Sequence, residues 1–324
     1  KCHLNTCPVG VATQDPVLRA RFTGQPEHVV NYMFFVAEEL RTIMAEMGIR
    51  TVAEMVGRVD LLDTRRMERH WKARGIDLGR ILHQVPLKAG ASLRQTGTQD
   101  HGLEGALDNQ LIADCHSAIA TKQPVQIALP IRNVHRTVGA MLSGEIAKAH
   151  GHEGLPTDTV RINLTGVAGQ SFGAWLAHGV TLDLVGDAND YVGKGLSGGT
   201  IIVRPTVSSP LTSQQNSIIG NTVLYGATSG RLLAAGQAGE RFAVRNSGAH
   251  VVVEGCGSNG LEYMTGGLAI ILGKVGSNFG AGMTGGMAFV LDTDGDFATM
   301  ANPDSIVWQR LASPYWEAHL RAMI

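Results

Sequence analysis

The sequence is poor in the features that mark several large classes of protein. It has four cysteines in 324 residues, too few for a disulfide framework in a chain of this length. Its longest apolar runs, residues 33–37 and 268–272, fall far short of the ~20 residues that a membrane-spanning helix needs. No cationic start followed by an apolar segment marks a secretory signal. These absences predict a soluble protein of the reducing cytoplasm.

An excess of charge of one sign is also missing. The chain carries 27 basic and 28 acidic residues, a net charge of −1, without a basic block that could neutralise a run of phosphates. Nucleic acid is therefore not an expected partner. At ~150 residues per domain the length suggests about two domains. The sequence begins at Lys1 without an initiator methionine and ends at Ile324 within an amphipathic pattern, so we expect a piece of a longer polypeptide.

Helical spacing dominates the first part of the chain. Apolar residues recur at intervals of three and four over residues 28–47, with Gly48 as a stop signal, which predicts a helix. The same character continues, so about the first 85 residues are predicted to be helical. Further predicted elements are helices over residues 52–56, 60–73, 109–119 and 305–324 and a strand over residues 125–131.

Glycine becomes frequent after residue 160, where the helical period disappears. Short β-branched strands follow glycines at spacings of 20, 31, 18, 19 and 19 residues. The long interval contains 12 residues, 205–216, with the Pro/Ser/Thr/Gln composition of a surface loop, and removing them restores the period. The glycines that introduce the strands are Gly179, Gly199, Gly230, Gly248, Gly267 and Gly286.

A repeat of this size predicts stacked structural units that bury their apolar faces against one another. About 19 residues with several glycines cannot supply two helices, but they can supply one coil of a β-helix. Successive strands would then pair in parallel, and glycines would turn the corners. An ordinary β-sandwich is the alternative, because its strands also follow at short intervals. The regular spacing favours the stacked coils.

Several short motifs in this half match the letters of functional sites. Three segments fit the dinucleotide pattern G-x-G-x-x-G, but the first and third run directly into strands and not into the helix that a pyrophosphate needs. We therefore interpret them as corners of the repeat. The three matches are Gly193/Gly195/Gly198, Gly255/Gly257/Gly260 and Gly280/Gly282/Gly285.

Two other motifs are open to a structural or a chemical interpretation. Residues 169–173 match the nucleophile elbow around Ser171, but no acid and histidine follow in a workable order. A tight turn satisfied by the hydroxyl is the favoured interpretation. Residues 186–190 bring carboxylates and an amide together, which suits either calcium or Asx turns at a coil corner. The turns are the commoner use.

The sharpest chemical signal lies at the front of the sequence. Cys2 and Cys7 are separated by four residues, and Pro8 follows, as in part of an iron–sulfur loop, where thiolates bind iron. Two thiolates cannot hold a cluster alone, so spacing leaves a metal role and ordinary thiols both open. Cys115 lies on an apolar helical face and is expected to be a buried free thiol, and Cys256 is isolated.

Longer stretches resemble one family. Residues 1–16, KCHLNTCPVGVATQDP, closely resemble the iron–sulfur loop of the large (alpha) subunit of glutamate synthase, and the resemblance extends to about residue 292. The sequence departs from the family pattern within residues 257–261, where a histidine and a cysteine are expected. Further matching stretches are residues 99–103, 186–199, 239–248 and 262–267.

The resemblance implies an iron–sulfur flavoprotein that makes two glutamates from glutamine and 2-oxoglutarate. In this family an amidotransferase domain releases ammonia, an FMN-bearing (β/α)8 barrel reduces the iminoglutarate, a 3Fe-4S cluster lies beside the flavin, and a right-handed parallel β-helix braces the other domains. On this mapping the chain is mainly β. Residues 1–87 are the helical tail of the FMN domain with part of the iron–sulfur loop, residues 88–300 the β-helix, and residues 301–324 a helical segment.

Site residues and partners are also implied. Cys2 and Cys7 match the second and third cluster ligands, and the first is expected upstream of Lys1. Complete 3Fe-4S and FMN sites are expected only in the full-length protein, so no catalytic residue is assigned and the chain alone is predicted to be inactive. The implied partners are the upstream amidotransferase and FMN domains and a small electron-donating subunit or ferredoxin, without nucleic acid or membrane. An independent β-helix scaffold or binding module is the alternative.

Overall fold

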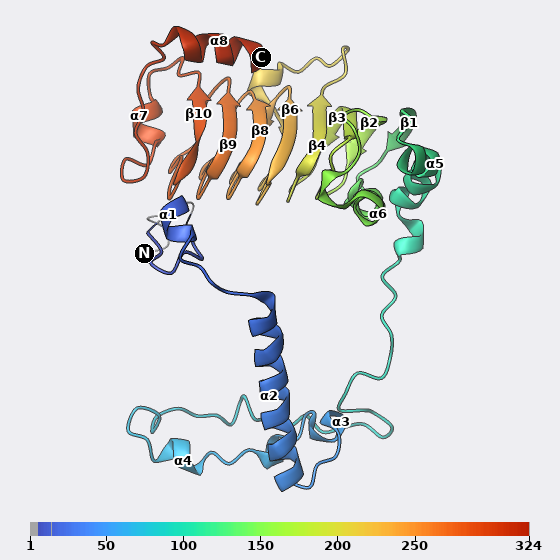
Figure 1. The fold of residues 1–324 in the computed structure, drawn as a ribbon, viewed down its shortest axis with the longest axis vertical. Coiled ribbons are helices and arrows are strands. Elements are labelled where there is room, and N and C mark those ends of the chain that lie inside the picture. The colour runs from blue at the N-terminus through green and yellow to red at the C-terminus, as the bar shows by residue number, and fades with distance from the viewer. Residues whose placement is uncertain (1–5, 14, 324) are drawn as a thin grey trace. The chain divides into compact units, whose positions relative to one another are not determined.

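A parallel β-solenoid forms the larger part of the structure, a computed structural model that describes residues 6–13 and 15–323. The chain divides into two compact units, of which one is Phe22–His101 and the other contains the remaining described residues. The main sheet of the second unit has the order β1-β2-β3-β4-β6-β8-β9-β10, and every neighbouring pair is parallel (Figure 1). Hairpins of a β-sandwich would give antiparallel pairs. The stacked coils predicted from glycine spacing are confirmed.

The strands lie where the glycine spacing placed them, and each predicted strand overlaps an observed one. Residues 205–216 hold only the 3₁₀ turn η5 (Ser213–Gln215), as expected for a surface loop. A second parallel sheet pairs β5 (Ser217–Ile219) with β7 (Gln237–Ala238). The main sheet contains β1 (Val125–Ile131), β2 (Val160–Ala168), β3 (Val180–Ala188), β4 (Ser197–Arg204), β6 (Ser229–Ala234), β8 (Ser247–Val253), β9 (Thr265–Ile271) and β10 (Gly285–Val290).

The core consists of inward side chains stacked from coil to coil. Register pairs Ile162 with Leu182, Leu182 with Ile201, and the row continues through Leu232 and Val251. All five side chains are fully buried. Burying one such side chain stabilises the fold by about 1.5–3 kcal/mol, so each coil is stabilised mainly by its two neighbours.

Each coil turns a corner through three left-handed residues that alternate with ordinary ones. Tyr191, Gly193 and Gly195 form one such corner, with φ of 63°, 63° and 64°. Their N–H groups donate to carbonyls of the two adjacent coils, for example Gly193 to Phe172 at 2.9 Å. These hydrogen bonds offset the cost of left-handed backbone at corners that lack glycine. Corners without glycine at these positions are Arg241/Ala243/Arg245 and Asn259/Leu261/Tyr263.

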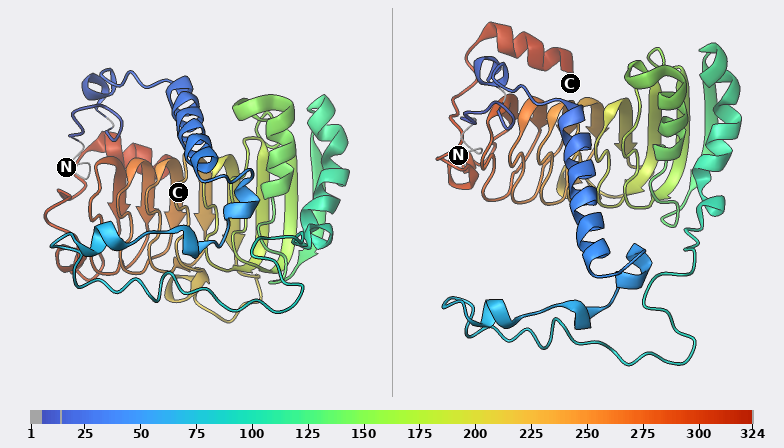
Figure 2. Two further views of the ribbon diagram at one scale, coloured as in Figure 1. Left: turned by 90° about the horizontal axis from the view of Figure 1, so that it is seen from below. Right: turned by 60° about the horizontal axis from the view of Figure 1, so that its bottom comes forward.

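Two helices close the stack at its β1 end (Figure 2). α5 (Leu107–Thr121) confirms the helix predicted near residues 109–119, whereas α6 (Ala140–His150) was not predicted. Leu111 of α5 and Leu142 and Ile146 of α6 are fully buried in the solenoid core. The short 3₁₀ turns here are η3 (Leu103–Gly105) and η4 (Gly151–Glu153).

At the other end the chain folds back over the last strand. α7 (Phe297–Met300) places the Phe297 ring 5.6 Å from Phe279 and 5.7 Å from Trp308. α8 (Pro314–Met323) contacts β10 through Trp316 and Phe289, whose centroids are 6.0 Å apart. The helix predicted over residues 305–324 therefore forms only from Pro314, because proline is well suited to the first helical turn and restricts the residue before it. Ile324 lies outside the described residues.

The unit Phe22–His101 contains one long helix. α2 (Pro26–Glu46) confirms the helix predicted over residues 28–47, and α3 (Val52–Met55) the one near 52–56. The prediction of a helix over 60–73, and of a wholly helical start, is wrong. Only η2 (Val59–Leu61) and α4 (Arg65–Glu68) form there, among exposed ion pairs such as Arg58–Asp60 at 2.7 Å. Short charged helices without a buried face are too weak to persist.

Candidate functional site

The cysteine loop at the front of the chain is partly described. Cys2 lies outside the described residues, so its ligand role stays a prediction. Cys7 begins a tight turn in which Gly10 N–H donates to the Cys7 carbonyl at 3.2 Å, with Pro8 at the second position, where proline is favoured. Asp15 then caps the short helix α1 (Pro16–Arg19) by accepting from its first N–H groups. The turn and the cap order the chain that follows Cys7.

The Cys7 thiol is buried, with 5% of its surface exposed. Backbone N–H groups of Ala12 and then Val9 lower the pKa of this thiol below its ordinary value, and burial acts in the opposite direction. A lowered pKa favours the thiolate, which is the form that binds iron. N–H donors around a cysteine sulfur are also a feature that tunes iron–sulfur clusters. Cys7 therefore fits a cluster ligand.

The other described cysteines have the opposite character. Cys115 is fully buried and Cys256 is 7% exposed, and burial raises their pKa values to about 11 and about 12. The expectation of a buried free thiol at Cys115 is confirmed. Neither residue suits metal binding or nucleophilic chemistry at neutral pH.

Thiol alkylation should separate these residues. In the Cys2→Ser form of the 324-residue chain, without a cluster, iodoacetamide at pH 8 should modify Cys7 at least about a hundredfold faster than Cys115 and Cys256. Their raised pKa values leave almost no thiolate at this pH. Peptide mass spectrometry over time measures the rates, and the same reaction in 6 M guanidinium is the control, because unfolding should equalise the three. Fast modification of Cys115 in the folded chain would contradict this assignment.

The glycine motifs and Ser171 belong to the corners of the solenoid. Gly193 and Gly195, and likewise Gly280 and Gly282, have left-handed backbone at equivalent corner positions. Ser171 occupies the first left-handed position of its corner, with φ 62°, and its N–H donates to Asp190 O at 2.8 Å. These segments lead to the next strand and not to a helix N-terminus, so the prediction of corner geometry is confirmed. Ser171 lies in a turn as predicted, but the hydrogen bond found there is made by its N–H group, so the role of its hydroxyl stays a prediction.

The carboxylates of residues 186–190 serve the backbone. Asp190 Oδ1 accepts from Asn221 N–H at 2.8 Å, and Asn189 Oδ1 accepts from Asp190 N–H at 2.7 Å. Asn221 Oδ1 in turn accepts from Glu240 N–H at 2.8 Å in the next coil. Within the described part of the chain, no three His, Cys, Asp or Glu side chains are grouped to hold a metal ion. Asn189 and Asp190 therefore cap backbone N–H groups at a coil corner, but they do so on the next residue and on the next coil and not in Asx turns.

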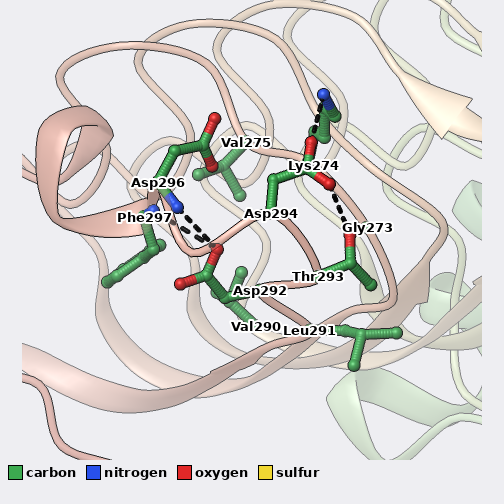
Figure 3. A pocket seen from close by; sticks show the side chains of 10 residues that line it. All are labelled: Gly273, Lys274, Val275, Val290, Leu291, Asp292, Thr293, Asp294, Asp296 and Phe297. Atoms are coloured by element: carbon green, nitrogen blue, oxygen red, sulfur yellow. Dashed lines mark hydrogen bonds and ion pairs between the residues drawn. The ribbon is translucent and has the colours of Figure 1, made fainter.

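A small pocket lies near the end of the stack, between the chain after β9 and the chain after β10 (Figure 3). Its volume of about 10 Å³ holds no more than one water molecule. Two of its carboxylates already have partners, since Asp294 pairs with Lys274 at 2.5 Å and Asp292 accepts from the N–H groups of Asp296 and Phe297. The Lys274 ammonium lowers the pKa of Asp294. The contacts that line the pocket stabilise a turn, and the pocket is too small for a substrate.

The departure from the family pattern within residues 257–261 has a structural account. Asn259 has left-handed backbone, and its Oδ1 accepts from Asn278 Nδ2 at 2.9 Å. Asn278 Oδ1 accepts in the same way from Asn302 Nδ2 at 2.9 Å. A Cβ on Gly260 would lie 2.9 Å from Cys256 Sγ and 3.0 Å from the Phe279 ring of the next coil. These residues therefore form an asparagine ladder beside a filled core position.

Comparisons with known proteins give the family. A sequence profile described as the GXGXG motif matches residues 108–324, and a profile described as a conserved region in glutamate synthase matches residues 1–50. The chain belongs to the GXGXG-motif family, as a portion of a glutamate synthase large chain. The helical start and the solenoid thus match two different conserved parts of the glutamate synthase family.

Individual relatives match along the whole chain. A protein named NADH glutamate synthase from Schizosaccharomyces pombe is 53% identical over 325 residues, which is 100% of this chain and 15% of the relative. The NADPH glutamate synthase large chain of Azospirillum brasilense is 51% identical over 331 residues, 100% of this chain and 21% of the relative. Ferredoxin-dependent glutamate synthase 2 of Synechocystis is 44% identical over 326 residues, which is 100% of this chain and 21% of the relative. The chain thus spans about a fifth or less of these glutamate synthases.

No helix among the described residues combines the length and the apolar character needed to cross a bilayer.

Proposed function

We propose that this chain works as part of a glutamate synthase large chain, which uses a reductant to convert glutamine and 2-oxoglutarate into two glutamates. The observation that carries the proposal is the match at 51% and 53% identity along the entire chain to proteins named as glutamate synthases. The solenoid supplies a rigid brace between the catalytic domains. The N-terminal loop supplies cluster ligands.

The cluster proposal rests on Cys7. Its thiol is buried and its pKa is lowered by backbone N–H groups, so the chain presents a thiolate where iron would bind. Cys2 is the second proposed thiolate of this chain, and a third comes from the polypeptide upstream. These thiolates would hold a 3Fe-4S cluster, which would supply electron transfer to the FMN domain. The role of residues 6–13 is to hold the Cys7 sulfur and exclude water from it.

The proposed partners are the amidotransferase and FMN domains of the same polypeptide and an electron donor. Relatives named for NADH, NADPH and ferredoxin all match the whole chain, at 53%, 51% and 44% identity. Residues that choose the donor therefore lie in other parts of the protein. The solenoid and the cysteine loop serve a step common to all three kinds of enzyme.

An assay of glutamate formation tests the proposal. The complete polypeptide, supplied with glutamine, 2-oxoglutarate and a reduced donor, should make glutamate, whereas the 324-residue chain alone should make none. Liquid chromatography of the amino acids measures both. Glutamate from the isolated chain, or none from the complete polypeptide with any of the three donors, would refute it.

Replacing Cys7 by serine should remove the cluster from the complete polypeptide. We expect bound iron and the electron paramagnetic resonance signal of the oxidised cluster to fall to less than about a tenth, because an alcohol is a poor ligand for iron at neutral pH. Flavin content reports whether the protein remains folded. Cys115→Ala is the matched control, since its thiol is fully buried in the solenoid core, and it should keep the signal. Retention of the cluster in Cys7→Ser would remove Cys7 from the ligand set.

A further inference from the structure

The sequence contains one Asn–Gly step, Asn259–Gly260, and it lies at a corner of the solenoid. Asparagine before glycine is chemically labile, because glycine has no Cβ to shield its nitrogen from the neighbouring amide carbon. In the reaction the Gly260 nitrogen bonds to Asn259 Cγ, and the bond from Cγ to Nδ2 breaks. Nδ2 leaves as ammonia with the Gly260 proton, and water then opens the cyclic imide to aspartate or isoaspartate. The step needs no reactant other than water.

The Asn259 side chain is tied to the next coil. An intramolecular attack of this kind needs the reacting atoms to meet at about 3–3.5 Å in the right orientation. Asn259 Oδ1 instead accepts from Asn278 Nδ2 at 2.9 Å, and Asn302 Nδ2 donates to Asn278 Oδ1 at 2.9 Å. The side-chain amide of Asn259 is therefore the first member of the asparagine ladder, Asn259, Asn278 and Asn302.

The main chain around the Asn–Gly step is held from both sides. Asn259 has left-handed backbone, with φ 59°, and its N–H donates to Ser277 O in the next coil at 2.8 Å. Leu261 N–H donates to Phe242 O in the preceding coil at 2.7 Å. Gly260 itself is buried. The peptide group between Asn259 and Gly260 thus has little freedom to turn toward the side-chain amide.

We propose that Asn259 is a latent deamidation site, which the asparagine ladder and the coil stack hold in the amide form. The Asn259 amide can bring Cγ onto the Gly260 nitrogen only by leaving the ladder, so the reaction proceeds through local opening of this corner. Isoaspartate would add one carbon to the main chain between the hydrogen bonds of Asn259 and Leu261. Since each coil is stabilised by its neighbours, that longer corner would loosen the stack irreversibly.

Deamidation kinetics in the complete polypeptide test the site. At pH 8, peptide mass spectrometry over several days should show Asn259 reacting at least about tenfold more slowly in the folded protein than in 6 M guanidinium. In guanidinium Asn259 should also react faster than Asn216, which serine follows. Equal rates at Asn259 in the folded and unfolded protein overturn the protection. An Asn259 rate in guanidinium that does not exceed that of Asn216 overturns the assignment of a labile site.

Two variants test the ladder. Asn278→Ala removes the donor to Asn259 Oδ1, so deamidation of Asn259 in the folded protein should be at least about threefold faster. Asn278 has φ 59°, and Asn278→Gly removes the same donor while accepting left-handed backbone without strain. Asn216→Ala is the matched control, because the Asn216 side chain donates to Thr212 O outside the ladder, and it should leave the rate unchanged.

Far-ultraviolet circular dichroism reports whether each variant keeps the fold, and rates are compared among folded variants. The same acceleration in Asn216→Ala as in the two Asn278 variants overturns the role of the ladder. So does an unchanged Asn259 rate in a folded Asn278 variant.

Discussion

Replacing Gly186 by alanine should destabilise the solenoid by about 4 kcal/mol. Gly186 lies in β3 with φ 144°, and an added Cβ would sit 1.7 Å from the carbonyl oxygen of Gly166 in β2. The obstacle is backbone, which cannot move without breaking the parallel pairing of Gly166 with Gly186. Overpacking and a disallowed backbone conformation each cost about 1–3 kcal/mol, so their sum is large.

Gly226→Ala is the matched control. Gly226 also has positive φ, at 64°, but no atom lies within 4 Å of an added Cβ. Only the left-handed backbone then opposes alanine, at a cost of about 1 kcal/mol. Urea unfolding followed by far-ultraviolet circular dichroism measures both variants. Equal losses for the two would show that close coil approach at Gly186 adds nothing to the backbone preference.

The glycines that introduce the strands show why the coil stack was predictable from sequence. At Gly230, Gly248 and Gly267 an added Cβ would collide with a carbonyl oxygen of the preceding coil, so close approach excludes a side chain at this position once per coil, about every 19 residues. The glycine spacing therefore predicted both the stacked coils and the positions of the strands. The helix α6 was not predicted because Gly144 interrupts its apolar spacing and lowers its helix propensity. Its stability comes from burial of Leu142 and Ile146, which local sequence does not express.

The candidate site was predictable to a smaller extent. The spacing of the cysteines and the residues around Cys7 predicted a cluster ligand, but the N–H groups that lower the pKa of Cys7 follow from the turn geometry.

Asp108→Ala should destabilise the chain by about 3 kcal/mol. Asp108 of α5 is 3% exposed, and its carboxylate accepts from the N–H groups of Gly139, Met141 and Leu142 at 2.8, 2.8 and 3.1 Å. It thus caps α6 from another helix by accepting from the N–H groups at the start of α6. Alanine would remove the cap and leave buried donors without an acceptor, which costs about 1–3 kcal/mol for each group that water cannot reach.

The pH dependence of stability distinguishes the charge of Asp108 from its shape. Burial raises the pKa of Asp108, and the three N–H groups only partly oppose the shift. A raised folded pKa means that the stabilising contribution is fully present below the unfolded pKa, near 3.8, and is lost as pH rises through the folded value.

The Asp108→Asn variant keeps the size and one acceptor but does not titrate there. Urea unfolding at several pH values should show the parent losing stability relative to this variant as pH rises above about 4. A relative gain instead would mean that the N–H donors and the helix dipole outweigh burial, and that Asp108 holds α6 as a charged cap.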